Sequence, residues 1–475
     1  MKSPKIGLLP LFLELYDRML PDCRALMQAF YNTVADGLRR QGLEVMTAPI
    51  CRLAAEFKAA ITVFEKAGVD AIVTLHLAYS PSLESAAALA ATRLPLIVLD
   101  TTPDYEFGPR QAPPRIMFNH GIHGVQDMCN LLLRNGKPFV IEAGHWRKSD
   151  VLKRVARRVV SARMATAMGR ARVGRIGKPF QGMGDFAVPA NVLKQTLGVI
   201  TVPESGRTIK KLLAAIRPAE IQAEMAADRK RFIVTKLNTE AHRRSVHVGL
   251  AVRRWMEIER LTAWTVNFLA VNRKSGIPTV PFLEAGKAMA RGFGYAGEGD
   301  VLTAALTGAL MTAYPDTTFT EMFCPDWKGN TVFLSHMGEV NVNLLVGRPH
   351  LEEMDYKFSD AENPVRVLGC LRGGPAVLVN LAPLTGNRFR LIITSVTMQT
   401  VRGPDRMKDS IHGWFRPSIP VADFLAAYSR AGGTHHAALV YGNAVPEIAG
   451  FGAFMGWETV VISSEKSVVR SQKSE

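Results

Sequence analysis

Five ionisable side chains interrupt apolar stretches in the second half of this 475-residue chain. Glu298 follows a glycine-rich segment, Glu321 lies in TTFTEMF, His336 follows TVFLS, and His435 and His436 precede AALVY. Two carboxylates and two imidazoles are a reasonable octahedral site for Mn²⁺ or a similar ion, with positions left for water or substrate oxygens. The absence of thiolates disfavours structural zinc. Each residue alone is more often a hydrogen-bonded core or edge residue, and the sequence does not show whether they converge.

The segment before Glu298 reads GFGYAG (292–297) and matches the dinucleotide-binding pattern GxGxxG. That pattern binds phosphate only where a strand immediately precedes it. Here the preceding LEAGKAMARG has helical periodicity. We therefore expect a glycine-rich turn between two helices, at 282–289 and 301–312, and no dinucleotide site. Asp300 is predicted to cap the second helix, and Glu298 would lie beside its N-terminus, where the helix dipole favours a carboxylate.

The elements that must position these residues fall into three regions. In residues 1–170, short apolar runs alternate with amphipathic ones, which predicts a parallel sheet covered by helices. The expected strands are 6–12, 43–48, 70–75, 95–99, 115–118 and 138–142. Residues 171–316 continue the α/β pattern, with strands at 173–177 and 262–268. Residues 317–475 carry β-branched runs separated by Gly and Pro, such as 375–381 and 388–398, which indicate an antiparallel, barrel-like domain.

Composition narrows the class of protein. The five cysteines are widely spaced without a CxxC motif, which favours a reducing, cytoplasmic location over a disulfide framework. The apolar run 6–13 is interpreted as a first strand and not a signal segment, and no run is long enough to span a membrane. The formal net charge is +16, and the densest basic stretch is 147–178. It is interpreted as a solvated helix face, so we expect neither a nucleic-acid nor a membrane partner.

Taken together, these motifs resemble the L-arabinose isomerases, with the L-fucose isomerases as more distant relatives. The resemblance rests on GFGYAGEGDVLTAAL, TTFTEMF, FLSHMGEV and AGGTHHAALV, supported by HLAYSP, NHGIHG, AGHW and GDFAV in order along the chain. It implies two Rossmann-like α/β domains followed by a mainly antiparallel β-barrel-like domain. It also implies a site with metal ligands, an acid/base pair and substrate contacts. The metal ligands are Glu298, Glu321, His336 and His436; the two glutamates are also the catalytic pair; the substrate contacts are His123, Phe268, Met337 and His435.

The implied activity is aldose–ketose isomerisation of a free sugar through a cis-enediol, with Mn²⁺, Co²⁺ or Mg²⁺ bound. The resemblance also implies a homotrimer or homohexamer in which His123 reaches the active site of a neighbouring subunit. One departure concerns the sugar, because Leu9 lies where the family has a substrate-binding glutamine. L-arabinose and related pentoses or hexoses therefore stay open. So do a metal-dependent sugar epimerase or lyase, and a non-catalytic sugar-binding relative.

Overall fold

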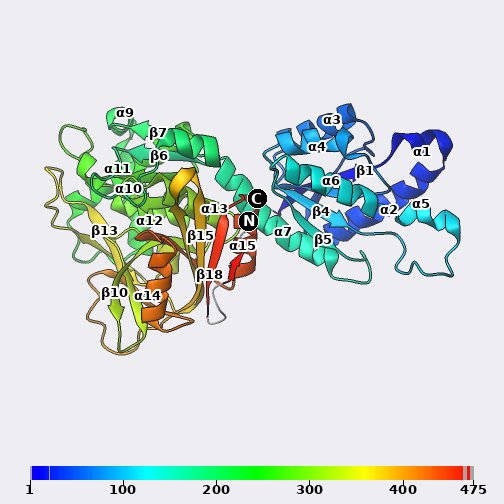
Figure 1. Cartoon of the computed structure of the whole chain (residues 1–475). Coiled ribbons are helices and arrows are strands. Elements are labelled where there is room, and N and C mark those ends of the chain that lie inside the picture. Colours follow the sequence, from blue (N-terminus) through cyan, green and yellow to red (C-terminus); the bar gives the residue numbers. More distant parts are fainter. Residues whose placement is uncertain (1–2, 21, 464–467, 471–475) are drawn as a thin grey trace. The chain divides into compact units, whose positions relative to one another are not determined.

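The computed structural model describes residues 3–20, 22–463 and 468–470 (Figure 1). These residues form two compact units. Among the described residues, the first unit runs to Thr166 and includes Gly450–Gly456, and the second comprises Ala167–Ala449, 457–463 and Val468–Arg470. The boundaries of the three domains expected from the sequence stay predictions. Within the described ranges, no helix combines the length and the apolar character needed to cross a membrane.

The first unit is built on a five-stranded parallel sheet with strand order β2-β1-β3-β4-β5. The strands are β1 (Lys5–Leu11), β2 (Glu44–Thr47), β3 (Ala71–His76), β4 (Leu96–Asp100) and β5 (Val140–Ala143). Every residue of β3 is buried, as expected for a central parallel strand covered on both faces. The long helices are α2 (Cys23–Arg40), α3 (Ala54–Lys66), α4 (Ser82–Ala91), α6 (Ile122–Arg134) and α7 (Val151–Gly169).

One expected strand of this unit is wrong. Residues 115–118 belong to a 3₁₀ turn at Pro113–Arg115 and to the short helix α5 (Ile116–Asn119). Pro113 and Pro114 explain the difference, because proline holds φ near the helical value and the first helical turn tolerates its missing N–H. The four-residue apolar run after them is too short for its pattern to separate strand from helix.

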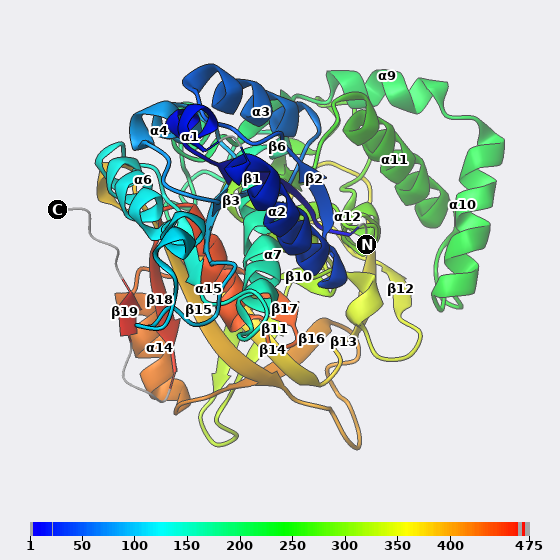
Figure 2. The same ribbon diagram turned by 90° about the vertical axis from the view of Figure 1, so that its right-hand side faces the viewer.

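The second unit begins with a four-stranded parallel sheet, ordered β7-β6-β8-β9. Its strands are β6 (Arg172–Ile176), β7 (Ile200–Glu204), β8 (Ala263–Val266) and β9 (Gly294–Gly297). Its main helices are α9 (Arg207–Ala215), α10 (Pro218–Arg231), α11 (Thr239–Ile258), α12 (Phe282–Ala290) and α13 (Val301–Met311). Helix α11 packs against both α9 and α10 (Figure 2). The two parallel α/β sheets expected from the sequence are confirmed.

A closed barrel of six antiparallel strands completes this unit. Neighbouring strands around it are β16-β11-β10-β17-β14-β15, and the pairing of β15 with β16 closes the ring. The strands are β10 (Thr317–Asp326), β11 (Thr331–Ser335), β14 (Gly374–Pro383), β15 (Phe389–Met398), β16 (Ile411–Pro417) and β17 (His436–Tyr441). Strands β12 (His350–Glu353), β13 (Val365–Cys370), β18 (Glu458–Ile462) and β19 (Val468–Arg470) extend the sheet. The predicted barrel-like region is therefore confirmed.

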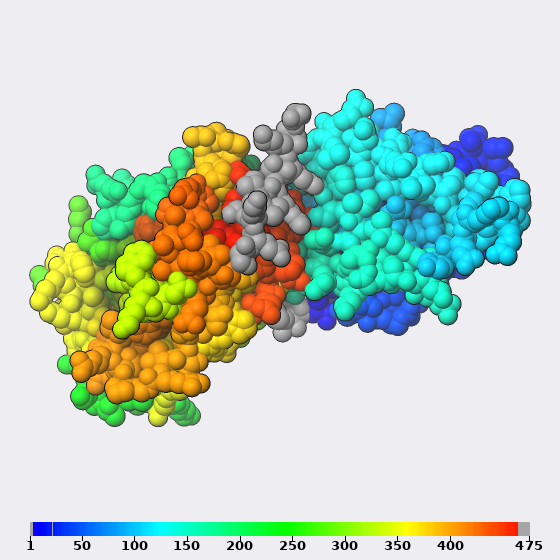
Figure 3. Space-filling view, turned by 60° about the horizontal axis from the view of Figure 1, so that its bottom comes forward, coloured from blue at the N-terminus to red at the C-terminus, as the bar shows by residue number. Residues whose placement is uncertain are grey.

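Two helices link the barrel to its surroundings in the same unit. Helix α13 contacts β6, β8 and β9 of the parallel sheet as well as β10, β14 and β17 of the barrel. It is apolar on nearly all sides, as a helix packed between two layers must be. Helix α14 (Val421–Arg430) begins at the β10–β11 turn, where the Val421 amide donates to Asn330 Oδ1 (2.7 Å). The adjoining surfaces of the hairpin and α14 are visible in lime green and orange (Figure 3).

The glycine-rich segment 292–297 also differs from expectation, because its last four residues form the buried strand β9 and not a turn. A Cβ on Gly294 would lie 2.3 Å from the Ala304 carbonyl oxygen and 2.5 Å from the Gly308 nitrogen. These glycines therefore bring the backbones of β9 and α13 together. They lie within the strand, whereas phosphate-binding glycines follow one, so the context for a dinucleotide site is missing.

Because backbone atoms block the space at Gly294, Gly294→Ala is expected to lower the free energy of unfolding by about 1–3 kcal/mol. Gly308→Ala is the matched control on the facing helix. Its Cβ would meet Thr262 O at 3.3 Å and Gly294 atoms at 3.4 Å. It also replaces a helical glycine, which favours the helix by about 1 kcal/mol. Urea denaturation of both variants checks the difference, and equal stability of the two would contradict this account of the close approach.

Candidate metal centre

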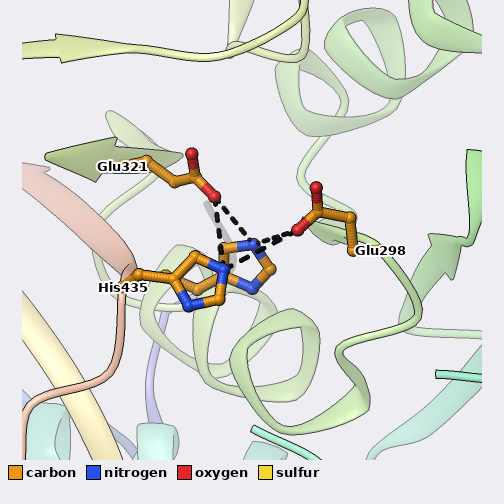
Figure 4. Close-up of side chains that lie close together, drawn as sticks. Glu298, Glu321 and His435 are labelled. Atoms are coloured by element: carbon orange, nitrogen blue, oxygen red, sulfur yellow. Dashed lines mark hydrogen bonds and ion pairs between the residues drawn. The ribbon is translucent and has the colours of Figure 1, made fainter. Parts of the chain in front are cut away.

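The candidate site lies where the parallel sheet of the second unit meets the barrel. Glu298 directly follows β9, Glu321 lies in β10, and His436 begins β17. Glu321 and His436 are opposite each other in the β10–β17 ladder. Figure 4 shows the carboxylates of Glu298 and Glu321 approaching the histidine rings from two sides. The site therefore joins a residue from the turn between β9 and α13 with residues from two neighbouring barrel strands.

The turn that carries Glu298 has an unusual backbone. Glu298 has φ +62° and Gly299 has φ +85°. A left-handed conformation at a residue other than glycine costs about 1 kcal/mol or more and persists only where its surroundings hold it. Here the Gly299 amide donates to Thr265 Oγ1 (3.0 Å). Asp300 caps α13 by accepting from the Thr303 amide (2.9 Å), as the sequence predicted. The strained turn thus delivers the Glu298 carboxylate to the site.

Three donor atoms are closely spaced. His436 Nε2 lies 3.0 Å from Glu298 Oε2 and 3.0 Å from Glu321 Oε1. His435 Nε2 is more distant, at 3.8 Å and 3.6 Å from the same two oxygens. His336 Nε2 lies 3.7 Å from Glu321 Oε1. Glu298, Glu321, His435 and His436 offer donor atoms that all lie within 4.8 Å of one another.

This donor set fits a divalent cation. Adjacent donors on an octahedral ion with bonds of about 2.1 Å are about 3 Å apart. His436 Nε2 has this spacing from both Glu298 Oε2 and Glu321 Oε1. His336 and His435 are each within 4 Å of a site carboxylate and could each supply a further nitrogen. Carboxylate oxygens with imidazole nitrogens suit ions such as Mn²⁺.

Packing restricts the motion of His436, which is fully buried. The Phe186 ring stacks on it at 4.9 Å between centroids with an interplanar angle of 16°. Phe319 meets it edge-on at 5.0 Å. With one ring on its face and another against its edge, the imidazole is restricted to a narrow range of orientations. Such pre-organisation is a requirement of a precise binding site.

The charges at the site are strongly coupled. Burial raises the pKa of Glu298, but the adjacent His435 and His436 rings outweigh it and hold this pKa well below its usual range. Burial lowers the pKa of His436, yet Asp300 and the two site glutamates raise it well above its ordinary value. In His336, the Glu339 carboxylate likewise overcomes burial and raises the pKa. Without a cation the site therefore favours protonated imidazoles beside ionised carboxylates.

These pKa shifts predict that rising pH lowers the stability of the metal-free protein and increases the stabilisation by a bound metal ion. A histidine whose pKa is higher in the folded state than in the unfolded chain stabilises the fold below about pH 6.5. That contribution disappears as pH rises through the folded pKa. Metal-free protein should therefore lose thermal stability as pH rises above about 6.5. A bound dication replaces the protons, so its stabilising effect should grow over the same range. Thermal midpoints in EDTA and in Mn²⁺ test this, and parallel curves would contradict it.

The other predicted site residues are more scattered. His435 is partly exposed and joins the cluster, whereas Met337 is half-buried beside His336. Phe268 is buried in the turn after β8, between the rings of Phe180 and Phe358. His123 is an exposed residue of α6 in the first unit. The individual roles assigned to the site residues stay predictions.

Two carboxylates next to the site were missed by the sequence analysis. Asp185 contacts His435, and Glu339 contacts both His336 and Tyr295. Glu339 follows His336 by three positions in SHMGEV, a spacing that could have indicated the contact. No sequence signal connects Asp185 with His435, because 250 positions separate them.

The fold and the site together define a class: an α/β protein with a closed antiparallel barrel and a candidate glutamate–histidine metal centre between sheet and barrel. Comparison with known proteins specifies the family. A model of the L-arabinose isomerase central domain matches residues 200–314, and one of the L-arabinose isomerase C-terminal domain matches residues 316–458. The chain belongs to the L-arabinose isomerase family.

Individual relatives agree over most of the chain. L-arabinose isomerase 1 of Bacillus licheniformis is 27% identical over 452 residues, which cover 88% of either chain. The L-arabinose isomerase of Clostridium beijerinckii is 25% identical over 400 residues, covering 83% of this chain and 81% of the relative. That of Thermotoga maritima is 24% identical over 416 residues, with the same two coverages. At this identity the family is clear, while the particular substrate is not specified.

Proposed function

We propose that this chain is a divalent-metal-dependent aldose–ketose isomerase acting on a free sugar, L-arabinose or a related pentose or hexose. The observation that carries the proposal is the placement of two glutamates, Glu298 and Glu321, at equal distances from His436 Nε2. A site that only bound metal would need groups that coordinate the ion but no acid/base pair. Two carboxylates on one small centre can also act as a general acid and a general base.

In this proposal the ligands are Glu298, Glu321, His336 and His436, and the ion is Mn²⁺, Co²⁺ or Mg²⁺. When bound, the cation would polarise the carbonyl group of the sugar. One glutamate removes the proton from the carbon beside the carbonyl and returns it to the neighbouring carbon, by way of a cis-enediol. The second glutamate moves the proton between the two oxygens. His435, Phe268 and Met337 are proposed to contact the sugar.

Isomerisation of a panel of aldoses by EDTA-treated protein, with and without Mn²⁺, tests the proposal. We expect ketose formation that requires added metal, and the sugar that reacts names the substrate. Metal binding without turnover on any aldose would favour an epimerase or lyase on the same scaffold. A protein that binds no divalent ion would overturn the metal-centre assignment as well.

We also propose a homotrimer or homohexamer in which His123 of one subunit reaches the centre of the next. Apolar side chains on α1 (Glu14–Met19), α5 and α6 support this. Among them Leu15, Met19, Ile116 and Ile122 are 42–67% exposed. Apolar groups that gather on one exposed surface are typical of contact sites. Light scattering gives the oligomer size. Mixed oligomers of inactive His123→Ala and Glu321→Gln chains should regain activity if sites are shared, and absence of recovery would contradict sharing.

We propose a cytoplasmic location because of the cysteines, as in the sequence analysis. All five cysteines lie in the described part of the chain as free thiols, which fits a reducing compartment.

A further inference from the structure

Each histidine at the site is held through its Nδ1 atom by a carboxylate outside the Glu298–Glu321 pair. The three contacts are His436 Nδ1 to Asp300 Oδ2 at 2.8 Å, His336 Nδ1 to Glu339 Oε2 at 2.5 Å, and His435 Nδ1 to Asp185 Oδ2 at 2.6 Å. An ionised carboxylate only accepts hydrogen bonds. Each Nδ1 must therefore carry the proton, and in each neutral ring the lone pair is on Nε2, the atom that faces the site glutamates.

Two of these carboxylates are fixed as well as buried. Asp300 and Glu339 are 0% and 2% exposed. Their second oxygens are already engaged: Asp300 Oδ1 accepts from the Thr303 amide (2.9 Å), and Glu339 Oε1 accepts from the Tyr295 hydroxyl (2.9 Å). Neither carboxylate can rotate without breaking a second buried hydrogen bond, which is costly in a low-dielectric interior. Asp185 also accepts from the His435 amide (2.9 Å), but both groups are partly exposed, so water can replace this hydrogen bond.

We propose that Asp300 and Glu339 are positioning residues that select the histidine tautomer able to bind the ion, Asp300 for His436 and Glu339 for His336. The inference rests on the proposed metal-dependent function and deepens it. The carboxylates do not touch the ion; they act through the rings. Loss of such an outer partner typically lowers metal affinity about 10–100-fold.

The double role of Asp300 allows a sharp test. In Asp300→Asn, the Thr303 amide can only donate, so it requires the amide oxygen of the new side chain. The NH₂ group then faces His436 Nδ1 and can only donate. His436 must place its proton on Nε2, and the lone pair turns away from the ion. In Asp300→Ser the hydroxyl still caps the helix, since Ser, Asn and Asp cap comparably. The shorter side chain leaves Nδ1 without its partner but does not impose the wrong tautomer.

The experiment is a calorimetric titration of the EDTA-treated full-length protein with Mn²⁺, alongside its metal-free thermal midpoint. We expect Asp300→Asn to bind Mn²⁺ about 10–100-fold more weakly than the natural chain. The Mn²⁺ affinity of Asp300→Ser should lie between those of Asp300→Asn and the natural chain, although Asn is closer to Asp in shape than Ser is. The metal-free midpoints of both variants should stay near that of the natural chain, because both retain the cap. A purely structural role for Asp300 would instead weaken folding and binding in parallel.

Wild-type affinity in Asp300→Asn, or weaker binding by Asp300→Ser than by Asp300→Asn, would overturn the inference. If Asp300→Asn does not fold, Asp300→Ser against the natural chain decides: a loss of affinity supports the inference and none overturns it. If neither folds, Glu339→Gln is judged by the same titration in the same way. If the natural chain does not bind Mn²⁺, the proposed function itself is refuted. If the natural chain and both variants bind Mn²⁺ equally well, only the positioning inference is refuted.

Discussion

Glu321→Gln should reduce kcat by about 10²–10⁴-fold when assayed at saturating Mn²⁺. Glutamine keeps the shape of the side chain and one oxygen for the ion, but it cannot take up or release a proton. The Glu321 side chain is 13% exposed and its Oε1 lies 3.0 Å from His436 Nε2, so a solvent base has poor access to replace it. Glu298→Gln should behave in the same way.

Two further variants separate chemistry from metal binding. His436→Ala should mainly lose the ion, so its activity should recover in part as Mn²⁺ is raised. Glu240→Gln is a control on the surface, where Glu240 pairs with Arg243 and is 60% exposed, and should retain normal turnover. Steady-state kinetics over a range of Mn²⁺ concentrations distinguish these cases. Full metal-stimulated activity in Glu321→Gln would refute the acid/base assignment.

Lys287→Met should destabilise the protein by about 3–5 kcal/mol. Lys287, on α12, is nearly buried and forms ion pairs with Asp228 (2.6 Å) and Glu224 of α10. Asp228 is 2% exposed, and His242 Nε2 of α11 lies 3.0 Å away. Methionine fills a similar volume but leaves the buried Asp228 charge without its cation. The penalty is the uncompensated charge, not the lost contact area.

An exposed pair supplies the control for this prediction. Arg243 and Glu240 lie 2.6 Å apart, but their side chains are 44% and 60% exposed. Solvent screens such a pair, so Arg243→Met should change stability by less than about 1 kcal/mol. Asp228→Asn introduced into Lys287→Met should restore part of the loss by removing the stranded charge. Urea denaturation measures all three, and a Lys287→Met value as small as that of Arg243→Met would contradict the buried-network interpretation.

The fold class could be predicted because its signals are local. Alternating apolar runs and amphipathic helices predict parallel sheets, and β-branched runs with Gly and Pro predict the barrel. The signals failed where a run was short. Residues 115–118 follow two prolines and are helical, and Gly294–Gly297 looked like a turn but is a strand. Strand β9 depends on the close approach of Gly294 to Gly308 of α13. This is a contact between two elements, and local periodicity does not predict it.

For the candidate site, the sequence alone determined the kinds of side chain and their apolar settings: two glutamates and the histidines at the ends of buried elements. It also determined the Asp300 cap, because capping depends on residues three positions apart. Only the tertiary structure decided that Glu321 and His436 face each other in one ladder, and that a left-handed backbone brings Glu298 to them. The contact between Asp185 and His435 is likewise decided only by the tertiary structure. These contacts join residues far apart in the chain, and their distances are set by sheet register and helix packing, which no local pattern encodes.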